Sequence, residues 1–280
     1  MGPTLLDRVS LPGDPGRPNE DAFGNAGAFA WVIDGATGLG DYECLDGPSD
    51  AACLAGTASA VIAERIEAGE TDLASLIAAA ITEAAYRFER DLVRPPEGRY
   101  QLPTASILLA RLDGDGIDVA ELGDCSLYAR GANGTLATIG SDAPGRARER
   151  ESARLMISHG ATLKTPEVRR RMRAGRATRN TPGGAWLLGI HPEAAAHVRR
   201  HRIALDAPYT ALLATDGFAA LVEDYGRYDA RGLLEAAGGN GLGSLGEELR
   251  TIERVEDPDC TAFPRFKPSD DATAVLVASI

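Results

Sequence analysis

Six short apolar runs most constrain the fold of this chain, because each has the length of a β-strand and carries turn residues at its ends. They cover residues 28–33, 105–112, 117–122, 126–129, 211–214 and 273–278. Asp113-Gly-Asp-Gly116 separates the second run from the third, and Asn133-Gly134 follows the fourth. Both sequences supply the positive φ that tight turns need, so they predict hairpin turns.

Two longer segments, 50–68 and 71–93, read as helices; in the second, apolar residues recur at helical spacing behind a Thr71 or Asp72 cap. Shorter helices are expected at 149–158 and 167–173. Residues 241–246 match a GxGxxG pattern, but no strand precedes them, so we expect a loop between helices. Helices lie between groups of strands without regular alternation, which favours an α+β layered fold over a doubly wound sheet, with residues 1–280 forming one domain.

Composition narrows the class of protein. The net charge of −12 argues against bulk nucleic-acid binding, and no apolar run approaches the length that spans a bilayer. The first residues lack the pattern of a signal peptide, so we expect a cytoplasmic protein that binds no membrane. We also expect a monomer. The four cysteines show no CxxC pair and the chain has only four histidines, so we expect reduced thiols and no zinc site.

Carboxylates recur where the apolar runs end. Val-Ile-Asp34-Gly35 and Ala-Thr-Asp216-Gly217 close two runs in the same way, each with a Gly that allows a sharp turn and leaves its carbonyl accessible. Another run leads into Gly123-Asp124, and the last is preceded by Asp270-Asp271. If the last strand is antiparallel to the first two, these carboxylates share one edge.

Such an edge needs a cation. Two unpaired carboxylates about 4 Å apart repel by roughly 4 kcal/mol at an effective dielectric of about 20, and here four or more would gather. Ligation by oxygen alone selects Mg²⁺, Mn²⁺ or Ca²⁺ rather than Zn²⁺. The residues themselves therefore predict a metal site, without naming a reaction.

The order of these motifs resembles the type 2C metal-dependent serine/threonine protein phosphatases, in particular their bacterial branch, from about residue 8 to 278. The motifs are Arg17-Pro-Asn-Glu20-Asp21, Val-Ile-Asp34-Gly35, Leu-Gly123-Asp124, Thr-Asp216-Gly217 and Asp270-Asp271-Ala-Thr273. The resemblance implies a four-layer αββα sandwich, in which two central antiparallel sheets are flanked by helices and a pair of Mn²⁺ or Mg²⁺ ions lies at one end.

The resemblance also implies roles for the first motifs. Asp34 matches the aspartate that bridges the two ions and serves catalysis, and the carbonyl of Gly35 joins one of them. Glu20 resembles a ligand of that second ion, with Asp21 beside it as a supporting or water-mediated ligand. Arg17 resembles the phosphate-binding arginine, although it lies three residues before Glu20 where the family usually has four.

The later motifs complete the implied site. Asp216 and Asp270 match the ligands of the first ion, and Asp124 resembles the residue that, with the Asp216 equivalent, holds a third, weaker ion in bacterial members. Asp271 takes the position usually held by Asn. Ala36-Thr-Gly38 lacks the His of eukaryotic members, and Pro103-Thr-Ala-Ser106 replaces a Gly-Ser-Thr type sequence, which we interpret as a structural variant.

A basic segment interrupts the acidic chain: residues 145–179 hold eleven Lys and Arg against three Glu. It corresponds to the variable flap of the family, here about 142–185. Arg169, Arg170, Arg171 and Arg173 have only Glu167 as a nearby acid, so we expect unpaired guanidinium groups that bind acidic phosphorylated substrate; the alternative is a solvated surface.

The resemblance implies a phosphatase acting on phosphoserine and phosphothreonine in proteins, through a water activated by two metal ions. Two alternatives stay open at this point. One is hydrolysis of a small phosphomonoester, and the other is a phosphatase-like module that binds a partner without turnover. The retained Glu20, Asp34, Asp216 and Asp270 argue against the module, whereas the shifted Arg17 favours it.

Overall fold

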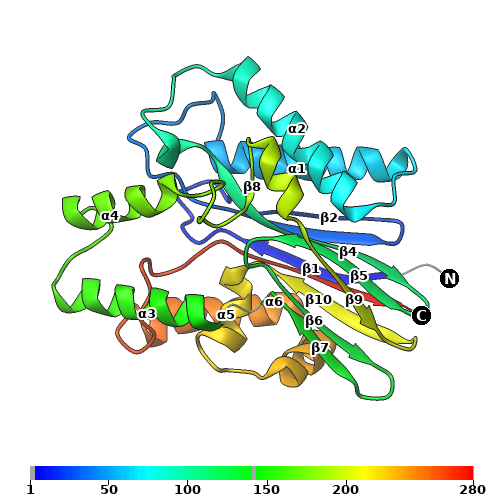
Figure 1. Ribbon diagram of the computed structural model, residues 1–280. Helices are drawn as coiled ribbons and strands as arrows, with labels where there is room; N and C mark the ends of the chain where they lie inside the picture. Colours follow the sequence, from blue (N-terminus) through cyan, green and yellow to red (C-terminus); the bar gives the residue numbers. More distant parts are fainter. Residues whose placement is uncertain (1–3, 141–142, 280) are drawn as a thin grey trace.

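The computed structural model of the protein describes residues 4–140 and 143–279. Two antiparallel sheets form its centre (Figure 1). One has the strand order β1 (Thr4–Leu11), β11 (Ala272–Ser279), β10 (Tyr209–Ala214), β6 (Ser126–Gly131), β7 (Leu136–Ile139). The other has the order β2 (Ala22–Ala26), β3 (Phe29–Gly35), β4 (Thr104–Asp113), β5 (Gly116–Leu122), β9 (Arg199–Ala204), with β8 (Leu188–Gly189) beside β4.

Helices cover the outer face of each sheet. Helices α1 (Asp50–Glu67) and α2 (Leu73–Asp91) pack on the six-stranded sheet, and α5 (Asp216–Glu223) and α6 (Ala230–Thr251) pack on the five-stranded sheet (Figure 1). The predicted four-layer αββα sandwich is therefore confirmed. Helices α3 (Ala143–Ser158) and α4 (Pro166–Ala177) lie beyond the sandwich at one end. The short helical turns are Arg99–Gln101, Pro192–His197 and Ile252–Glu256.

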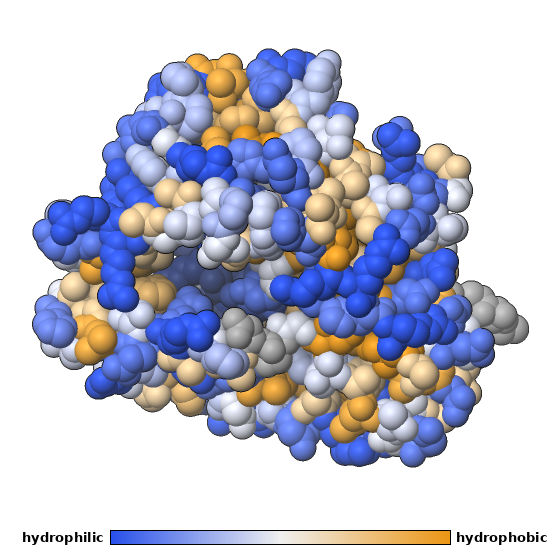
Figure 2. All heavy atoms as spheres, in the orientation of Figure 1, coloured by the Kyte–Doolittle hydropathy of each residue, from blue (hydrophilic) through white to orange (hydrophobic). Residues whose placement is uncertain are grey.

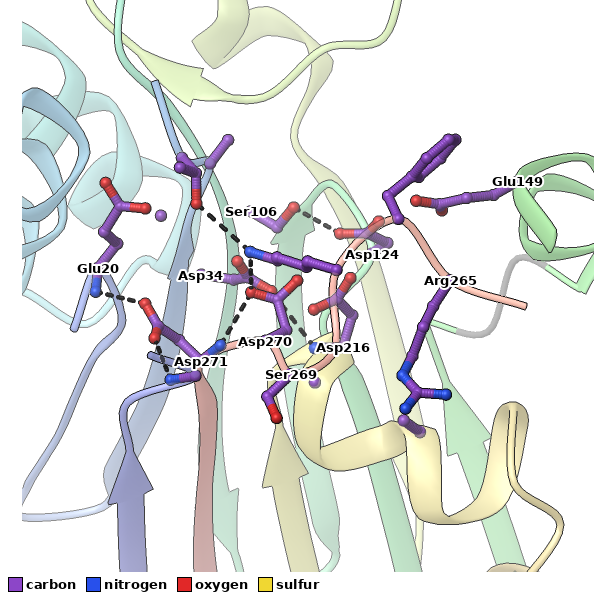
Figure 3. Close-up of a pocket in the computed structure, with 18 of the residues that line it drawn as sticks. Glu20, Asp34, Ser106, Asp124, Glu149, Asp216, Arg265, Ser269, Asp270 and Asp271 are labelled. Atoms are coloured by element: carbon purple, nitrogen blue, oxygen red, sulfur yellow. Dashed lines mark hydrogen bonds and ion pairs between the residues drawn. The ribbon is translucent and has the colours of Figure 1, made fainter. Parts of the chain in front are cut away.

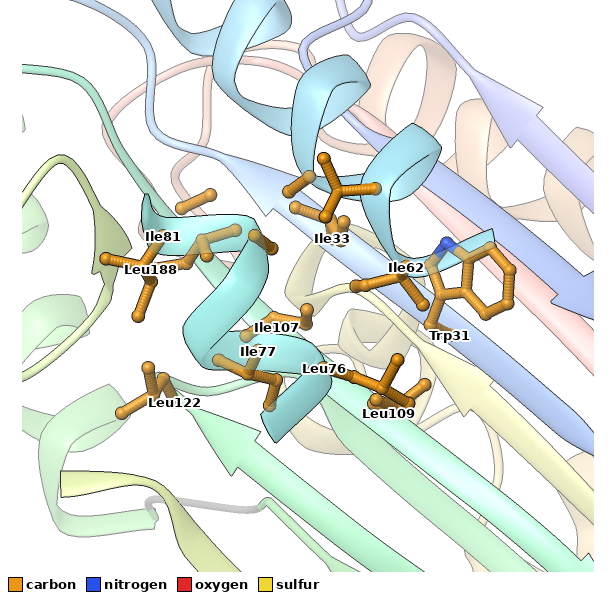
Figure 4. Packing of buried hydrophobic residues seen from close by; sticks show 14 of the residues in the cluster. Trp31, Ile33, Ile62, Leu76, Ile77, Ile81, Ile107, Leu109, Leu122 and Leu188 are labelled. Atoms are coloured by element: carbon orange, nitrogen blue, oxygen red, sulfur yellow. The ribbon is translucent and has the colours of Figure 1, made fainter. Parts of the chain in front are cut away.

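Strand alternation builds three apolar layers. In β3, Trp31 and Ile33 face α1 and α2, whereas Ala30 and Val32 face the other sheet. Figure 4 shows the first set packed against helical side chains such as Ile62. The indole of Trp31 donates a hydrogen bond of 2.9 Å to Ser59 Oγ, which satisfies its polar atom in the core. By the same alternation, the residue after Ile33 points between the sheets.

The six predicted strands and four predicted helices all exist, with ends shifted by a few residues. Of the two residues predicted as possible caps of α2, Asp72 is the cap and accepts from the Ser75 amide at 2.9 Å. Strands β1, β2, β7, β8 and β9 and helices α5 and α6 were not predicted. The loop between helices expected at 241–246 is confined to one residue: Gly241, at φ 81°, breaks α6 into two helical parts, and the residues after it are helical. Leu242 and Leu245 are buried there, so packing on the sheet maintains the helix.

The first and the last described strand lie side by side. Strands β1 and β11 are antiparallel neighbours in which Thr4 pairs with Ala278, at the end of the sandwich opposite α3 and α4 (Figure 1). No helix in the described ranges is both long and apolar enough to cross a membrane. The four cysteines are free, as expected.

Candidate metal centre

Strand ends from both sheets meet at the end of the sandwich that faces α3 and α4. Asp34 is the next-to-last residue of β3. It lies on the same face of the strand as Ala30 and Val32, which is the face toward the other sheet. Asp216 directly follows Thr215 after β10, and Asp270 precedes β11, which is antiparallel to β10. Figure 3 shows these three carboxylates side by side. The predicted shared edge is therefore present.

Two glycines allow the backbone segments to approach closely. A Cβ on Gly35 would lie 2.2 Å from the Glu20 carbonyl oxygen, and one on Gly217 would lie 2.0 Å from that of Asp271. The turn predicted at Asp216-Gly217 is wrong, because both residues begin α5, with Thr215 as its N-cap. Glycine is needed here for close packing of main chains rather than for a turn.

The carboxylates repel one another. Burial, and after it the charges of Asp216 and Asp21, raise the pKa of Asp34 well above its usual value. Burial, then Asp270 and Asp124, raise the pKa of Asp216 to about 7. Burial likewise raises the pKa of Asp21. Holding all of these groups ionised at neutral pH therefore requires positive charge nearby.

One carboxylate oxygen of Asp21 also indicates that a cation belongs in this site. Its Oδ2 accepts a hydrogen bond of 3.0 Å from Thr215 Oγ1, whereas its Oδ1 is buried and has no partner among the described residues. A buried carboxylate oxygen without a partner is costly unless a cation or water meets it.

A lysine supplies part of the missing charge. Lys267 Nζ lies 2.5 Å from Asp270 Oδ1 and 3.4 Å from Thr37 Oγ1. Burial by itself would lower the pKa of Lys267, but the surrounding charges, Asp270 first, raise it above its usual value. As the side chains stand, no three His, Cys, Asp or Glu residues in ranges 4–140 and 143–279 are close enough to enclose an ion.

The remaining predicted ligands surround this centre. Glu20 is buried, and its Oε1 accepts a hydrogen bond of 2.7 Å from Ser49 Oγ. Asp124 lies opposite, where its Oδ1 accepts one of 2.6 Å from Ser106 Oγ. Ser106 belongs to the segment interpreted as a structural variant, so that segment contacts the site. Serine hydroxyls thus fix one oxygen of each carboxylate.

A cleft of 1260 Å³ opens over the carboxylates. Figure 2 shows it as a hollow lined with hydrophilic residues. Arg17 is exposed on its rim, together with cations from the α3–α4 segment. The cations of that segment that line the cleft are Arg146, Arg150, Lys164, Arg169, Arg176 and Arg179.

The predicted unpaired arginines of α4 divide into two sets. Arg169 and Arg173 both pair with Asp41, at 2.5 and 3.4 Å, and donate to the carbonyls of residues 39 and 40. The prediction that they lack carboxylate partners is therefore wrong, because the acid comes from a distant part of the chain. Arg170 and Arg171 are exposed on the other side of the helix.

Two functional candidates of α4 and its C-terminal end were missed. Arg176 donates to the Thr37 carbonyl, and Arg179 donates a hydrogen bond of 2.8 Å to Thr104 Oγ1. Burial, followed by the charge of Arg179, lowers the pKa of Arg176 to about 9. The spacing of 169, 173 and 176 by four and three residues is the signal that could have placed them on one helical face.

Helix α3 is anchored on the opposite wall. Arg146 pairs with Glu223 at 2.5 Å and with Asp224 at 2.7 Å, and Arg150 pairs with Asp224 at 2.9 Å. Glu223 is the last residue of α5, the helix that begins at Asp216, and Asp224 is its C-cap. The α3–α4 segment is thus attached to both walls of the cleft, each time close to a chain segment that carries a site carboxylate.

Solved structures share this architecture. The crystal structure of the serine/threonine phosphatase PstP/Ppp of Mycobacterium tuberculosis matches with a TM-score of 0.58 and 17% identity, over 99% of each chain. The catalytic domain of PstP in complex with two manganese ions matches with a TM-score of 0.56 and 17% identity, over 99% of this chain and 97% of that one. The phosphatase MsPP of Mycobacterium smegmatis, in complex with cacodylate, gives 0.52 and 17%, over 99% of each.

None of the curated proteins compared with the chain matches it. The sequence profile described as protein phosphatase 2C matches residues 14–236, well over half of the chain and including most of the carboxylates described above. The two alternatives, a small-molecule phosphomonoesterase and a binding module, are not favoured by this match. The chain therefore belongs to the protein phosphatase 2C family of metal-dependent serine/threonine protein phosphatases.

Proposed function

We propose that the carboxylates at the end of the sandwich hold two Mn²⁺ or Mg²⁺ ions and that the cleft above them hydrolyses phosphoserine and phosphothreonine in proteins. The observation that carries the proposal is the gathering of Asp34, Asp216 and Asp270 at one edge, with the pKa values of Asp34 and Asp216 raised by burial and by neighbouring carboxylates. The match to the family supports it, as do the two manganese ions named for the PstP catalytic domain.

The donor set fits hard divalent cations. It consists of oxygen atoms, and the unpartnered Oδ1 of Asp21 offers one more. Asp34, centrally placed, would bridge the two ions. Glu20 and the Gly35 carbonyl would serve one of them, and Asp216 and Asp270 the other. A third, weaker ion would involve Asp124.

Two divalent cations at such a site supply a hydroxide nucleophile near neutral pH and neutralise charge that develops on the phosphoryl oxygens. The chain's own residues orient these groups. Ser49 and Ser106 fix one oxygen of Glu20 and of Asp124. Arg17, on the rim of the cleft, would bind the phosphoryl group. Lys267 would compete with an ion for Asp270, because its ammonium already lies 2.5 Å from Asp270 Oδ1.

The test of metal dependence uses a phosphothreonine peptide with Mn²⁺, then with excess EDTA. Turnover should disappear with the chelator and return with added metal. Asp34→Asn should lose both turnover and manganese binding, because this residue would serve both ions. Undiminished turnover in EDTA would refute the proposal.

The flap, about 142–185 in a single phosphatase domain, is proposed to meet the protein part of the substrate. Arg170 and Arg171 are exposed and suited to acidic segments. Arg169 and Arg173 instead hold residues 39–41 close to the site. Of the four arginines predicted to bind substrate, two are therefore proposed to do so, and the other two are proposed to position the loop.

Matched double variants separate these roles. Arg170→Gln with Arg171→Gln should raise KM for an acidic phosphopeptide, with little effect on a small aryl phosphate. Arg169→Gln with Arg173→Gln should impair both substrates, because the loop after Gly35 loses its anchors. If the two double variants changed the kinetics of both substrates to the same extent, the two pairs of arginines would not have separate roles. If the Arg170→Gln, Arg171→Gln variant kept the wild-type KM for the phosphopeptide, these two arginines would be a solvated surface without a role in substrate binding.

A further inference from the structure

Asp271 makes contacts unlike those of its neighbour Asp270. Its Oδ1 accepts a hydrogen bond of 2.7 Å from the Gly13 amide, and its Oδ2 accepts one of 2.7 Å from the Glu20 amide (Figure 3). One carboxylate therefore binds both ends of loop 13–20, a segment more than 250 residues away in the chain. Because each of its oxygens accepts a hydrogen bond from a main-chain N–H, Asp271 holds the backbone of this loop in place.

Loop 13–20 is ordered internally as well. The Gly16 amide donates a hydrogen bond of 2.8 Å to Asp14 Oδ1, and the Arg17 amide donates one of 3.0 Å to the Asp14 carbonyl. Pro15 and Pro18 restrict the backbone on both sides of this turn. Arg17 is the one cation of this segment, and its side chain reaches the rim of the cleft. Fixing the two ends of the loop therefore fixes the base from which Arg17 extends.

The Gly13 end is tightly packed. A Cβ on Gly13 would lie 2.6 Å from the carbonyl carbon of Asp270, so main chains are in direct contact there. Arg254 Nη2 donates a hydrogen bond of 3.0 Å to the Gly13 carbonyl. The Glu20 end is packed too, against Gly35. Asp271 thus completes a junction in which little room exists for an alternative loop path.

The chemistry of this junction requires a carboxylate. Two amide N–H groups point at two different oxygens, and Asp offers an acceptor at each. Asn has one acceptor oxygen and one NH₂ donor, so it would leave one main-chain N–H facing a donor. The acid at position 271 is therefore matched to this path of loop 13–20.

We propose that Asp271 is a positioning residue for substrate binding, which sets the place of Arg17 by holding both ends of loop 13–20. The inference rests on the proposed phosphatase function of the site. It also accounts for the position of Arg17, three residues before Glu20. The two hydrogen bonds of Asp271, and not the number of residues alone, determine where the Arg17 side chain leaves the loop.

The test compares Asp271→Asn with wild type in amide hydrogen exchange and in kinetics. Exchange of at least one of the Gly13 and Glu20 amides, the one left without an acceptor, should accelerate about tenfold, as expected for loss of one charge-assisted hydrogen bond. KM for an aryl phosphate should rise by about the same factor, with a smaller change in kcat. Unchanged exchange at both amides, or unchanged KM, would overturn the proposal.

A double-mutant cycle tests whether Asp271 acts through Arg17. Arg17→Gln alone should raise KM, and adding Asp271→Asn to it should raise KM little further, because the arginine that was being positioned is gone. Fully additive effects on KM would overturn the proposal by showing a separate structural role.

The adjacent carboxylate provides the matched control. Asp270→Asn should lose manganese affinity in calorimetry while loop 13–20 keeps its exchange protection, and Asp271→Asn should do the reverse. Lost manganese binding with intact protection in Asp271→Asn would make Asp271 a ligand and overturn the inference. Retained binding in Asp270→Asn would count against the proposed metal set, whereas the exchange result for Asp271 would still stand.

Discussion

Replacing Asp216 by Asn should remove a large part of the pH dependence of the stability of the metal-free protein between about pH 4 and about pH 7. Burial, then Asp270 and Asp124, raise the pKa of Asp216 from 3.8 to about 7. The folded state therefore keeps a proton that the unfolded chain releases. The resulting stability is fully present below the unfolded pKa and is lost as pH rises through the folded pKa.

The size of the effect follows from the shift. About three pKa units at about 1.4 kcal/mol each give a loss on the order of 4 kcal/mol across this range. Asp34 acts in the same direction, because its pKa is raised too. Asn keeps the shape of Asp216 but cannot ionise, and its neutrality also eases the ionisation of Asp34. The stability of the variant should therefore depend less steeply on pH in this interval, and Asp34 and Asp21, whose pKa values burial also raises, account for the dependence that remains.

Urea denaturation in excess EDTA, at several pH values, measures the free energy of unfolding of both proteins. Groups remote from the site titrate alike in both, so the difference between the two curves reports the carboxylate cluster. Added Mn²⁺ should stabilise wild type and the variant much less, because Asp216 is a proposed ligand. Parallel pH curves for the two proteins would refute the idea that carboxylates crowd Asp216.

Three further predictions concern single side chains. Lys267→Met should bind Mn²⁺ more tightly in calorimetry, because no ammonium then competes at Asp270; an unchanged or weaker affinity would contradict this. Asp124→Ala should lower turnover in a way that excess metal partly restores, while Asp34→Ala stays inactive at any metal concentration; equal rescue of both would argue against separate roles. Asp257→Ala should cost about 3 to 5 kcal/mol in urea unfolding, since its buried carboxylate pairs with an arginine at 2.6 Å and accepts three backbone amides; a loss under about 1 kcal/mol would show that the loop tolerates its absence.

Elements with a buried apolar run were predictable, and those without one were missed. Strand β10 is buried along most of its length, so its sequence shows the run directly. Strand β9, Arg199–Ala204, is an exposed sheet edge whose arginines pair with acids of other elements, such as Arg202 with Asp113 at 2.8 Å. Its sequence therefore resembles a charged loop. Only the neighbouring strand β5 defines it as a strand.

Helix α6 was missed because six of its 22 residues are glycines, which local propensity disfavours in a helix. The structure explains at least one of them: a Cβ on Gly246 would lie 2.6 Å from Leu11 Cδ1, so the helix packs closely on β1. Tertiary packing thus overrides propensity, and that information is absent from a local window of sequence.

The residues of the site also differ in how well they could be predicted from local sequence. The strand-end carboxylates were predictable because each motif is short and local in sequence. Partners that join distant segments were not, as Asp41 with Arg169 or Asp271 with the Gly13 amide. The sequence shows which residues are charged, but the fold determines which group neutralises each charge.

The adjacent chain ends bear on how the protein can be rearranged. Because Thr4 and Ala278 are partners on neighbouring strands, a short glycine-rich linker should join the ends with little strain. New ends could then be opened at the Asn133-Gly134 turn between β6 and β7. A circular permutant of this kind breaks neither the carboxylate cluster nor loop 13–20, so it should retain the catalytic end of the sandwich while carrying any fused tag on an edge of the five-stranded sheet.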